Sequence, residues 1–171
     1  MPHEQLQGGV STSPDPLSSP GPEALAAWRV FLECAFALPD ILDAELQHTA
    51  GLSLRWYDVL VQLEDADDGV PMNEVATRIL ASKSGLTRIV DNMVKAGLVR
   101  RERPEDDRRV VLVFVTPEGH AALEAARSVH RDGIRRHFTE HLTDADLRSL
   151  ARTLEKVRGH ARPLRPGRVS G

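Results

Sequence analysis

Residues 82–100 read Ser-Lys-Ser-Gly-Leu-Thr-Arg-Ile-Val-Asp-Asn-Met-Val-Lys-Ala-Gly-Leu-Val-Arg. Apolar residues recur here at three- and four-residue spacing, which predicts an amphipathic helix. Its predicted buried stripe is Leu86, Ile89, Val90, Met93 and Val94. Ser82 is placed to cap the first turn, and Gly97 to end the helix in the left-handed conformation that glycine adopts readily. The opposite face is polar and carries Lys83, Ser84, Thr87, Arg88, Asp91 and Lys95.

The flanking segments place this helix in a larger unit. A short helix is expected before it, capped by Asn73 and ending near Leu80 and Ala81. Two strand-like runs follow it, at residues 98–103 and 110–116, and the loop 104–109 joins them as a hairpin. The order helix, tight turn, helix, hairpin predicts a winged helix-turn-helix.

This unit is suited to DNA. The major groove is roughly 12 Å wide and admits one α-helix, which a second helix can anchor. Arginines at the hairpin tip suit the narrower minor groove, where the potential is negative. The candidate DNA-binding residues are Ser82, Lys83, Ser84, Thr87, Arg88, Asp107, Arg108 and Arg109.

Charge is distributed unevenly along the 171 residues, although the formal net charge is only −3. Residues 1–71 carry 2 basic and 12 acidic side chains, whereas residues 72–109 carry 9 basic and 6 acidic ones. A basic central segment in an acidic chain favours a local anion-binding surface, for which nucleic acid is the commonest large anion. The alternative is a basic face that is merely solvated.

The rest of the chain predicts four more helices, so the fold class is mainly α with a small β-hairpin. A long helix spans residues 22–51, with a kink or a break at Leu38 because Pro39 lies inside it. Ser53 caps the next helix. The last two helices begin at Thr116-Pro117 and at the capping box of Thr143 and Asp146. Apolar positions of the last helix are Leu147, Leu150, Leu154 and Val157.

The predicted domain occupies residues 22–161, between a disordered leader (1–21) and a basic flexible tail (162–171). Its DNA-binding lobe spans about residues 53–116. A single cysteine excludes an intramolecular disulfide, and no run approaches the roughly 18 apolar residues of a membrane span. These features predict a cytoplasmic protein without membrane contact.

Residues 82–100, together with Asp107-Arg-Arg109 and Val115-Thr-Pro-Glu-Gly119, resemble the MarR family of bacterial transcriptional regulators. The resemblance extends from Trp28 to Val157. It implies a homodimer held by the helices at about 22–50 and 117–160, and repression of nearby genes. It also implies release by a small aromatic or phenolic ligand or by oxidation. Arg109 corresponds to the wing-tip arginine, and Asp107 to the carboxylate that orients it.

The function expected is therefore a sequence-specific DNA-binding transcriptional regulator, a repressor, that binds a palindromic operator as a homodimer. The alternative is a winged-helix module that binds protein and does not read DNA. A cationic recognition helix paired with a cationic hairpin tip favours DNA.

Several side chains are candidates for an effector site or for other chemistry. Trp28, Trp56 and Tyr57 are candidates to line a ligand pocket or to belong to the core, and His48 and Arg55 are weaker candidates to bind a carboxylate. Cys34 is interpreted as a buried structural cysteine, with a redox-sensing thiol as the alternative. The His137, Glu140, His141 spacing is interpreted as an exposed helix end, with a metal site as the alternative. We expect no enzyme activity, no metal and no cofactor.

Overall fold

The computed structural model describes residues 19–79, 83–104, 107 and 109–160, and of Lys83 and Ser84 it describes the backbone alone. The predicted tail and nearly all of the predicted leader lie outside these residues, as do Ser82 and Arg108. The chain divides into two units, residues 1–36 and residues 37–171.

Helix α1 (Pro22–Ala50) begins in the first unit and ends in the second. It runs through Pro39 without interruption, so the break considered at Leu38 is wrong. Proline removes one backbone donor, which leaves the carbonyl of Ala35 without its helical partner. Because Ala35 is exposed, water can satisfy that carbonyl.

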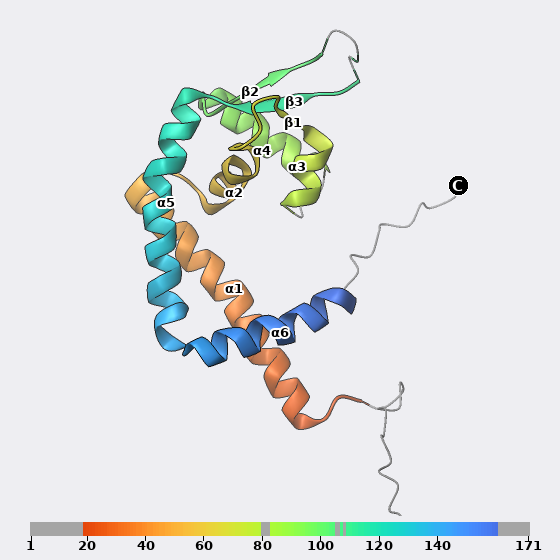
Figure 1. Ribbon diagram of the computed structural model, residues 1–171, viewed down its shortest axis with the longest axis vertical. Helices are drawn as coiled ribbons and strands as arrows, with labels where there is room; N and C mark the ends of the chain where they lie inside the picture. Colours follow the sequence, from red (N-terminus) through yellow and green to blue (C-terminus); the bar gives the residue numbers. More distant parts are fainter. Residues whose placement is uncertain (1–18, 80–82, 105–106, 108, 161–171) are drawn as a thin grey trace, which may run out of the picture. The chain divides into compact units, whose positions relative to one another are not determined.

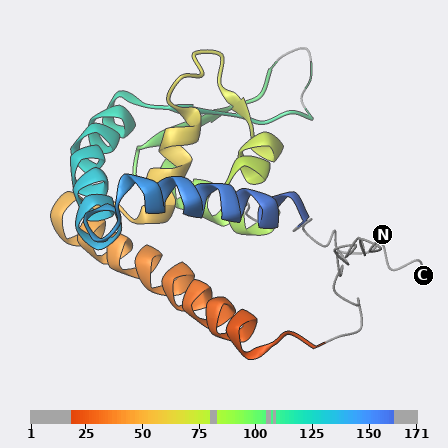
Figure 2. The same cartoon turned by 60° about the horizontal axis from the view of Figure 1, so that its bottom comes forward.

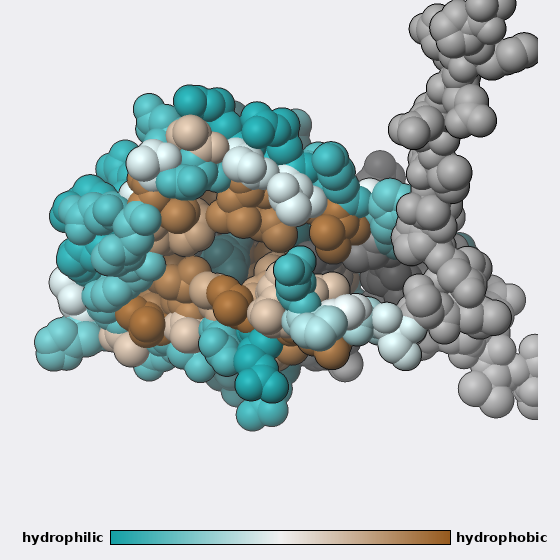
Figure 3. All heavy atoms as spheres, turned by 90° about the horizontal axis from the view of Figure 1, so that it is seen from below, coloured by the Kyte–Doolittle hydropathy of each residue, from teal (hydrophilic) through white to brown (hydrophobic). Residues whose placement is uncertain are grey.

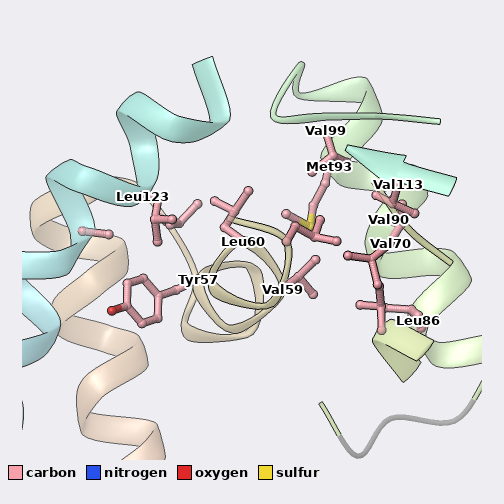
Figure 4. Packing of buried hydrophobic residues seen from close by; sticks show 14 of the residues in the cluster. Tyr57, Val59, Leu60, Val70, Leu86, Val90, Met93, Val99, Val113 and Leu123 are labelled. Carbon is pink, nitrogen blue, oxygen red and sulfur yellow. The ribbon is translucent and has the colours of Figure 1, made fainter. Parts of the chain in front are cut away.

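Helix α2 (Leu54–Leu63) lies at the centre of the core of the second unit (Figure 4). Its predicted cap is confirmed, because Ser53 Oγ accepts a hydrogen bond of 3.2 Å from the Trp56 N–H. Leu60 and Val59 are fully buried, and Leu123 of α5 packs on one side of them. On the other side lie apolar side chains of α4 and the sheet, among them Met93, Val90, Val99 and Val113.

A three-stranded antiparallel sheet takes the order β1 (Val70–Pro71), β3 (Leu112–Val115), β2 (Val99–Glu102). The predicted hairpin is β2 and β3, with Val99 opposite Val115. Strand β1 was not predicted, because two residues are too few to show alternation. The hairpin extends past helices α3 and α4 (Figures 1 and 2).

Helix α3 (Met72–Arg78) follows β1 directly, with Pro71 at its N-cap. The expectation that Asn73 caps this helix is wrong, because Pro71 pairs with Leu112 in the sheet and the helix starts at the next residue. Helix α4 (Lys83–Lys95) ends as predicted: Gly97 has a φ of +75°. The Leu98 N–H there donates to the Met93 carbonyl at 3.0 Å.

The last elements are α5 (Pro117–His137), the short 3-10 helix η1 (Thr139–His141) and α6 (Asp144–His160). Both predicted starts are confirmed. Thr116 Oγ1 accepts from the Gly119 N–H at 3.0 Å, and Thr143 and Asp146 each bond the other's backbone N–H, at 3.0 and 3.2 Å. Among the described helices, none is long and apolar enough to cross a membrane.

Candidate nucleic-acid interface

One face of helix α4 packs against the core, and the opposite face is open to solvent. Leu86, Val90 and Met93 are fully buried, so three successive contacts hold the helix against the core. Val94, which the sequence pattern placed in the buried stripe, is 39% exposed. The prediction that Val94 is buried is therefore wrong. The physical reason is that Val94, which follows Met93, lies at the edge of the apolar stripe.

The opposite face of α4 carries two of the predicted DNA-binding side chains. Thr87 and Arg88 are both exposed. Ser82 lies outside the described residues, and for Lys83 and Ser84 only the helical backbone is described. A hydroxyl and a guanidinium in successive positions near the start of a helix are groups that bind base edges and phosphates.

The wing comprises β2, β3 and the loop between them, and its tip carries Asp107 and Arg109. An Asp107 carboxylate oxygen accepts a hydrogen bond of 3.0 Å from the backbone N–H of Arg109. The Asp107 carbonyl accepts a second, of 3.2 Å, from the Val110 N–H. Asp107 therefore holds the main chain of the tip, and both its own side chain and that of Arg109 are exposed. Arg108 lies outside the described residues.

Arg101 is a residue to which the sequence interpretation gave no role. It projects from β2 and forms an ion pair with Asp91 of α4, with 2.5 Å between Nη1 and the carboxylate oxygen. The sequence could have indicated this position, because successive side chains of a strand point to opposite faces. Arg101 comes two residues after Val99 and therefore shares the buried face of the strand with it.

Two neighbouring pockets lie beside α2, each with a volume of about 400 Å³. Arg55 lines the first, and Tyr57 and His130 line the second. Asp58 and Ile79 line both. The structure thus places two of the predicted ligand-binding residues in adjoining pockets.

The other three predicted ligand-binding residues lie elsewhere. Trp28 belongs to the first unit, where it is 54% exposed and its ring stacks on that of Phe31, with 5.7 Å between the centroids. His48 is exposed and Trp56 is half-buried. Neither His48 nor Trp56 lines either of the two pockets beside α2. A ligand role for these three residues stays a prediction.

Desolvation shifts the pKa values of two side chains of the second pocket, Asp58 and His130. Burial raises the pKa of the Asp58 carboxyl, against the opposing charges of His130 and Arg55. Burial also lowers the pKa of His130, against the opposing charge of Asp58. The His130 ring lies 4.4 Å from that of Tyr57, centroid to centroid. An imidazole in this setting is neutral at pH 7.

The structure also shows the surroundings of Cys34 and of the His137, Glu140, His141 group. Cys34 is exposed in the chain, so the expectation that it is buried is wrong here, because the first half of α1 presents its side chains to solvent. His137 Nε2 bonds Glu45 of α1 at 2.8 Å, and Glu140 pairs with Arg135. Both side chains therefore hold contacts within the fold.

Comparison with known proteins gives a consistent result. A family model described as "MarR family" matches residues 50–110. The HTH-type transcriptional repressor IacR of Pseudomonas putida is 32% identical over 103 residues. That match covers 60% of this chain and 60% of IacR, so it spans less than two thirds of the repressor's length.

Two solved structures from Streptomyces coelicolor match over most of their length. AbsC, a MarR family transcriptional regulator, is 33% identical with a TM-score of 0.77, and the match covers 84% of this chain and 97% of AbsC. Sco3205, a MarR family transcriptional regulator crystallised in complex with DNA, is 31% identical with a TM-score of 0.79. Its match covers 85% of this chain and 96% of Sco3205.

Proposed function

The chain belongs to the MarR family, and from this premise we propose that it is a sequence-specific DNA-binding transcriptional regulator that acts as a repressor in the cytoplasm. The observation that carries the proposal is the pairing of two exposed cationic elements on one core. Arg88 lies on the open face of α4, and Arg109 lies at the tip of the wing, whose strand β2 contacts α4. The DNA complex of Sco3205, which shares this fold, supports the same interpretation.

The proposed division of labour follows from groove geometry. Arg88 and Thr87 on α4 read base edges in the major groove, where each base pair has a distinct pattern of donors and acceptors. Arg109 enters the minor groove, which reports mainly width and A·T content. A two-fold homodimer places its two α4 helices about 34–36 Å apart, so the operator is an imperfect palindrome.

An effector site is proposed beside α2. Arg55 and Tyr57 line its two pockets and offer a cation and an aromatic ring. Asp40, Asp43 and Asp58 line the first pocket together with Arg55, so this site suits a small phenol better than an aromatic acid. Titration with benzoate and with phenol, followed by tryptophan fluorescence, tests this site. Arg55→Gln should weaken benzoate binding and leave phenol binding unchanged.

The experiment that tests the DNA-binding proposal selects duplexes from a random library with the full chain and then compares affinity for a selected and a scrambled duplex. Arg88→Ala should lose about 1–3 kcal/mol on the selected duplex and relax the preference at one base pair of each half-site. The matched control is Lys95→Ala, which removes one positive charge from the exposed last turn of the same helix. It should weaken both duplexes alike.

The proposal is contradicted if neither Arg88→Ala nor Arg109→Ala changes affinity for the selected duplex by about 1 kcal/mol, because the winged region then does not read DNA. The protein-interaction module would then replace the regulator.

A further inference from the structure

The side chain of Arg101 joins the wing to the helix that is proposed to read DNA. Its Nη1 donates to a carboxylate oxygen of Asp91 at 2.5 Å, and its Nη2 donates to the backbone carbonyl of Thr87 at 3.2 Å. Thr87 and Asp91 are four residues apart on α4, which is about one helical turn. One guanidinium therefore binds both ends of the turn that carries Arg88.

The position of Arg101 is unusual for a residue that serves stability alone. Its side chain is only 27% exposed, and its Nε is buried without a hydrogen-bond partner among the described residues. An unpaired buried donor lowers stability, and an apolar side chain on this face of the strand would avoid that loss. The two hydrogen bonds from Arg101 to α4 explain why this position holds an arginine and not an apolar residue.

The strand register separates Arg101 from its neighbour Arg100. Arg101 lies opposite the fully buried Val113 and shares its strand face with Val99. Arg100 lies on the other face, where its guanidinium is 4.1 Å from the centroid of the Phe114 ring and pairs with Glu102 of its own strand. The two arginines carry the same charge one residue apart, and the contacts of Arg100 lie within the sheet.

We infer that Arg101 is a positioning residue for DNA recognition, which fixes the orientation of α4 relative to the wing so that both elements meet one duplex in register. The inference rests on the proposed function. Specific binding requires α4 and the wing to engage at the same time, so its affinity falls when their relative orientation is free. Non-specific binding depends on positive charge and tolerates many orientations.

The test compares Arg101→Gln with Arg100→Gln in the full chain, on a duplex selected by the wild type and on a scrambled duplex. Arg101→Gln should lower affinity for the selected duplex at least tenfold and for the scrambled duplex less than threefold. Arg100→Gln should lower both by the same small factor. Arg101→Lys should behave like Arg101→Gln, because an ammonium lacks the planar fork that holds two acceptors.

Asp91→Ala supplies an independent variant, since it removes the carboxylate contact from the helix side at a partly exposed position. It should lower affinity for the selected duplex less than Arg101→Gln does, because the bond from Arg101 to the Thr87 carbonyl remains. The double variant should lose no more than Arg101→Gln alone, because Arg101→Gln already breaks both contacts. Asp91→Ala carries the comparison if Arg101→Gln does not fold, as judged by thermal unfolding.

Amide hydrogen exchange of the DNA-free protein gives a second readout. Arg101→Gln should speed exchange in α4 relative to the wild type, and Arg100→Gln should not. The inference alone is overturned if the wild type discriminates between the duplexes but Arg101→Gln and Arg100→Gln cannot be distinguished on either one. It is also overturned if exchange in α4 is unchanged by Arg101→Gln. A wild type that selects no duplex overturns the proposed function and this inference with it.

Discussion

Asp107 accepts a hydrogen bond from the backbone N–H of Arg109, with 3.0 Å between its Oδ1 and the amide nitrogen. This is the bond that a side-chain oxygen makes to the main chain two residues on, and it fixes a turn. The family resemblance implies that Asp107 orients the wing arginine. In the structure the contact of the Asp107 side chain is to the backbone N–H of Arg109, at which that arginine side chain begins.

Substitutions at the wing tip should therefore form a graded series. Arg109→Ala should weaken DNA binding most and reduce the salt dependence of affinity by about one charge per subunit. Asp107→Ala should weaken binding less, because the arginine remains and only the turn is loosened. Asp107→Asn should retain nearly all affinity, because an amide oxygen accepts the same hydrogen bond. Kd should be measured at salt concentrations from about 50 to about 200 mM, because affinity that depends on phosphate contacts falls steeply over this range. The slopes and the affinities then distinguish the variants.

The outcome for Asp107→Asn decides between two roles. Loss of affinity as large as that of Asp107→Ala would mean that the negative charge acts on the guanidinium directly. The hydrogen bond to the backbone would then be incidental.

The sequence predicted elements whose ends depend on local chemistry. The starts of α2, α5 and α6 each need one hydroxyl or carboxylate within three residues of an exposed N–H, and such pairs are visible in the sequence. Strand β1 and the start of α3 depend on pairing with β3, about forty residues further along the chain by sequence number. A strand of two residues has no pattern of its own.

The same distinction applies to the candidate site. Helical periodicity predicted that Thr87 and Arg88 lie on the open face of α4, and the structure confirms their exposure. The contact between Arg101 and Asp91 depends on where β2 lies against α4, which no local pattern encodes. Val94 and Cys34 show a further limit, because apolar spacing does not distinguish a face buried within the chain from one left open.

The exposed apolar side chains of α6 should hold a homodimer together. Leu154 and Val157 are 38% and 55% exposed at helical spacing, and Figure 3 shows apolar residues open to solvent on one face of the molecule. Leu154→Glu combined with Val157→Glu should produce monomers at low micromolar concentration in sedimentation, because charges would be buried at the interface. Deleting residues 143–171 should abolish dimerisation as well.

The control for the dimer is Ala145→Glu on the same helix. Ala145 is exposed and nine residues before Leu154, about two and a half turns, so it lies on the opposite side of α6. The variant should remain dimeric. A stable folded monomer of the wild type at low micromolar concentration would contradict the proposed assembly.

The stability of the fold should fall as the pH drops from about 7.5 to about 5.5, through the unfolded pKa of histidine near 6.5. Burial lowers the pKa of His130 in the folded state, so the unfolded chain binds the extra proton first and gains stability from it. His130→Gln should flatten this part of the profile, measured as urea midpoints at each pH. Equal profiles for wild type and His130→Gln would contradict this origin.

Gly119 should tolerate no side chain, because a Cβ there would overlap the backbone carbonyl oxygen of Leu98 and approach Val115 to 2.8 Å. A carbonyl in the main chain cannot rotate away as the end of a side chain can. Gly119→Ala should therefore cost about 2–3 kcal/mol in the free energy of unfolding. Gly159→Ala is the matched control, since the added Cβ meets no atom within 4 Å beyond its chain neighbours and the adjoining backbone of its own helix, and alanine favours a helix by up to about 1 kcal/mol over glycine. Urea unfolding should show a lower midpoint for the first variant and an equal or higher one for the second. Equal midpoints for both variants would mean that α5 shifts away from Leu98 at little cost.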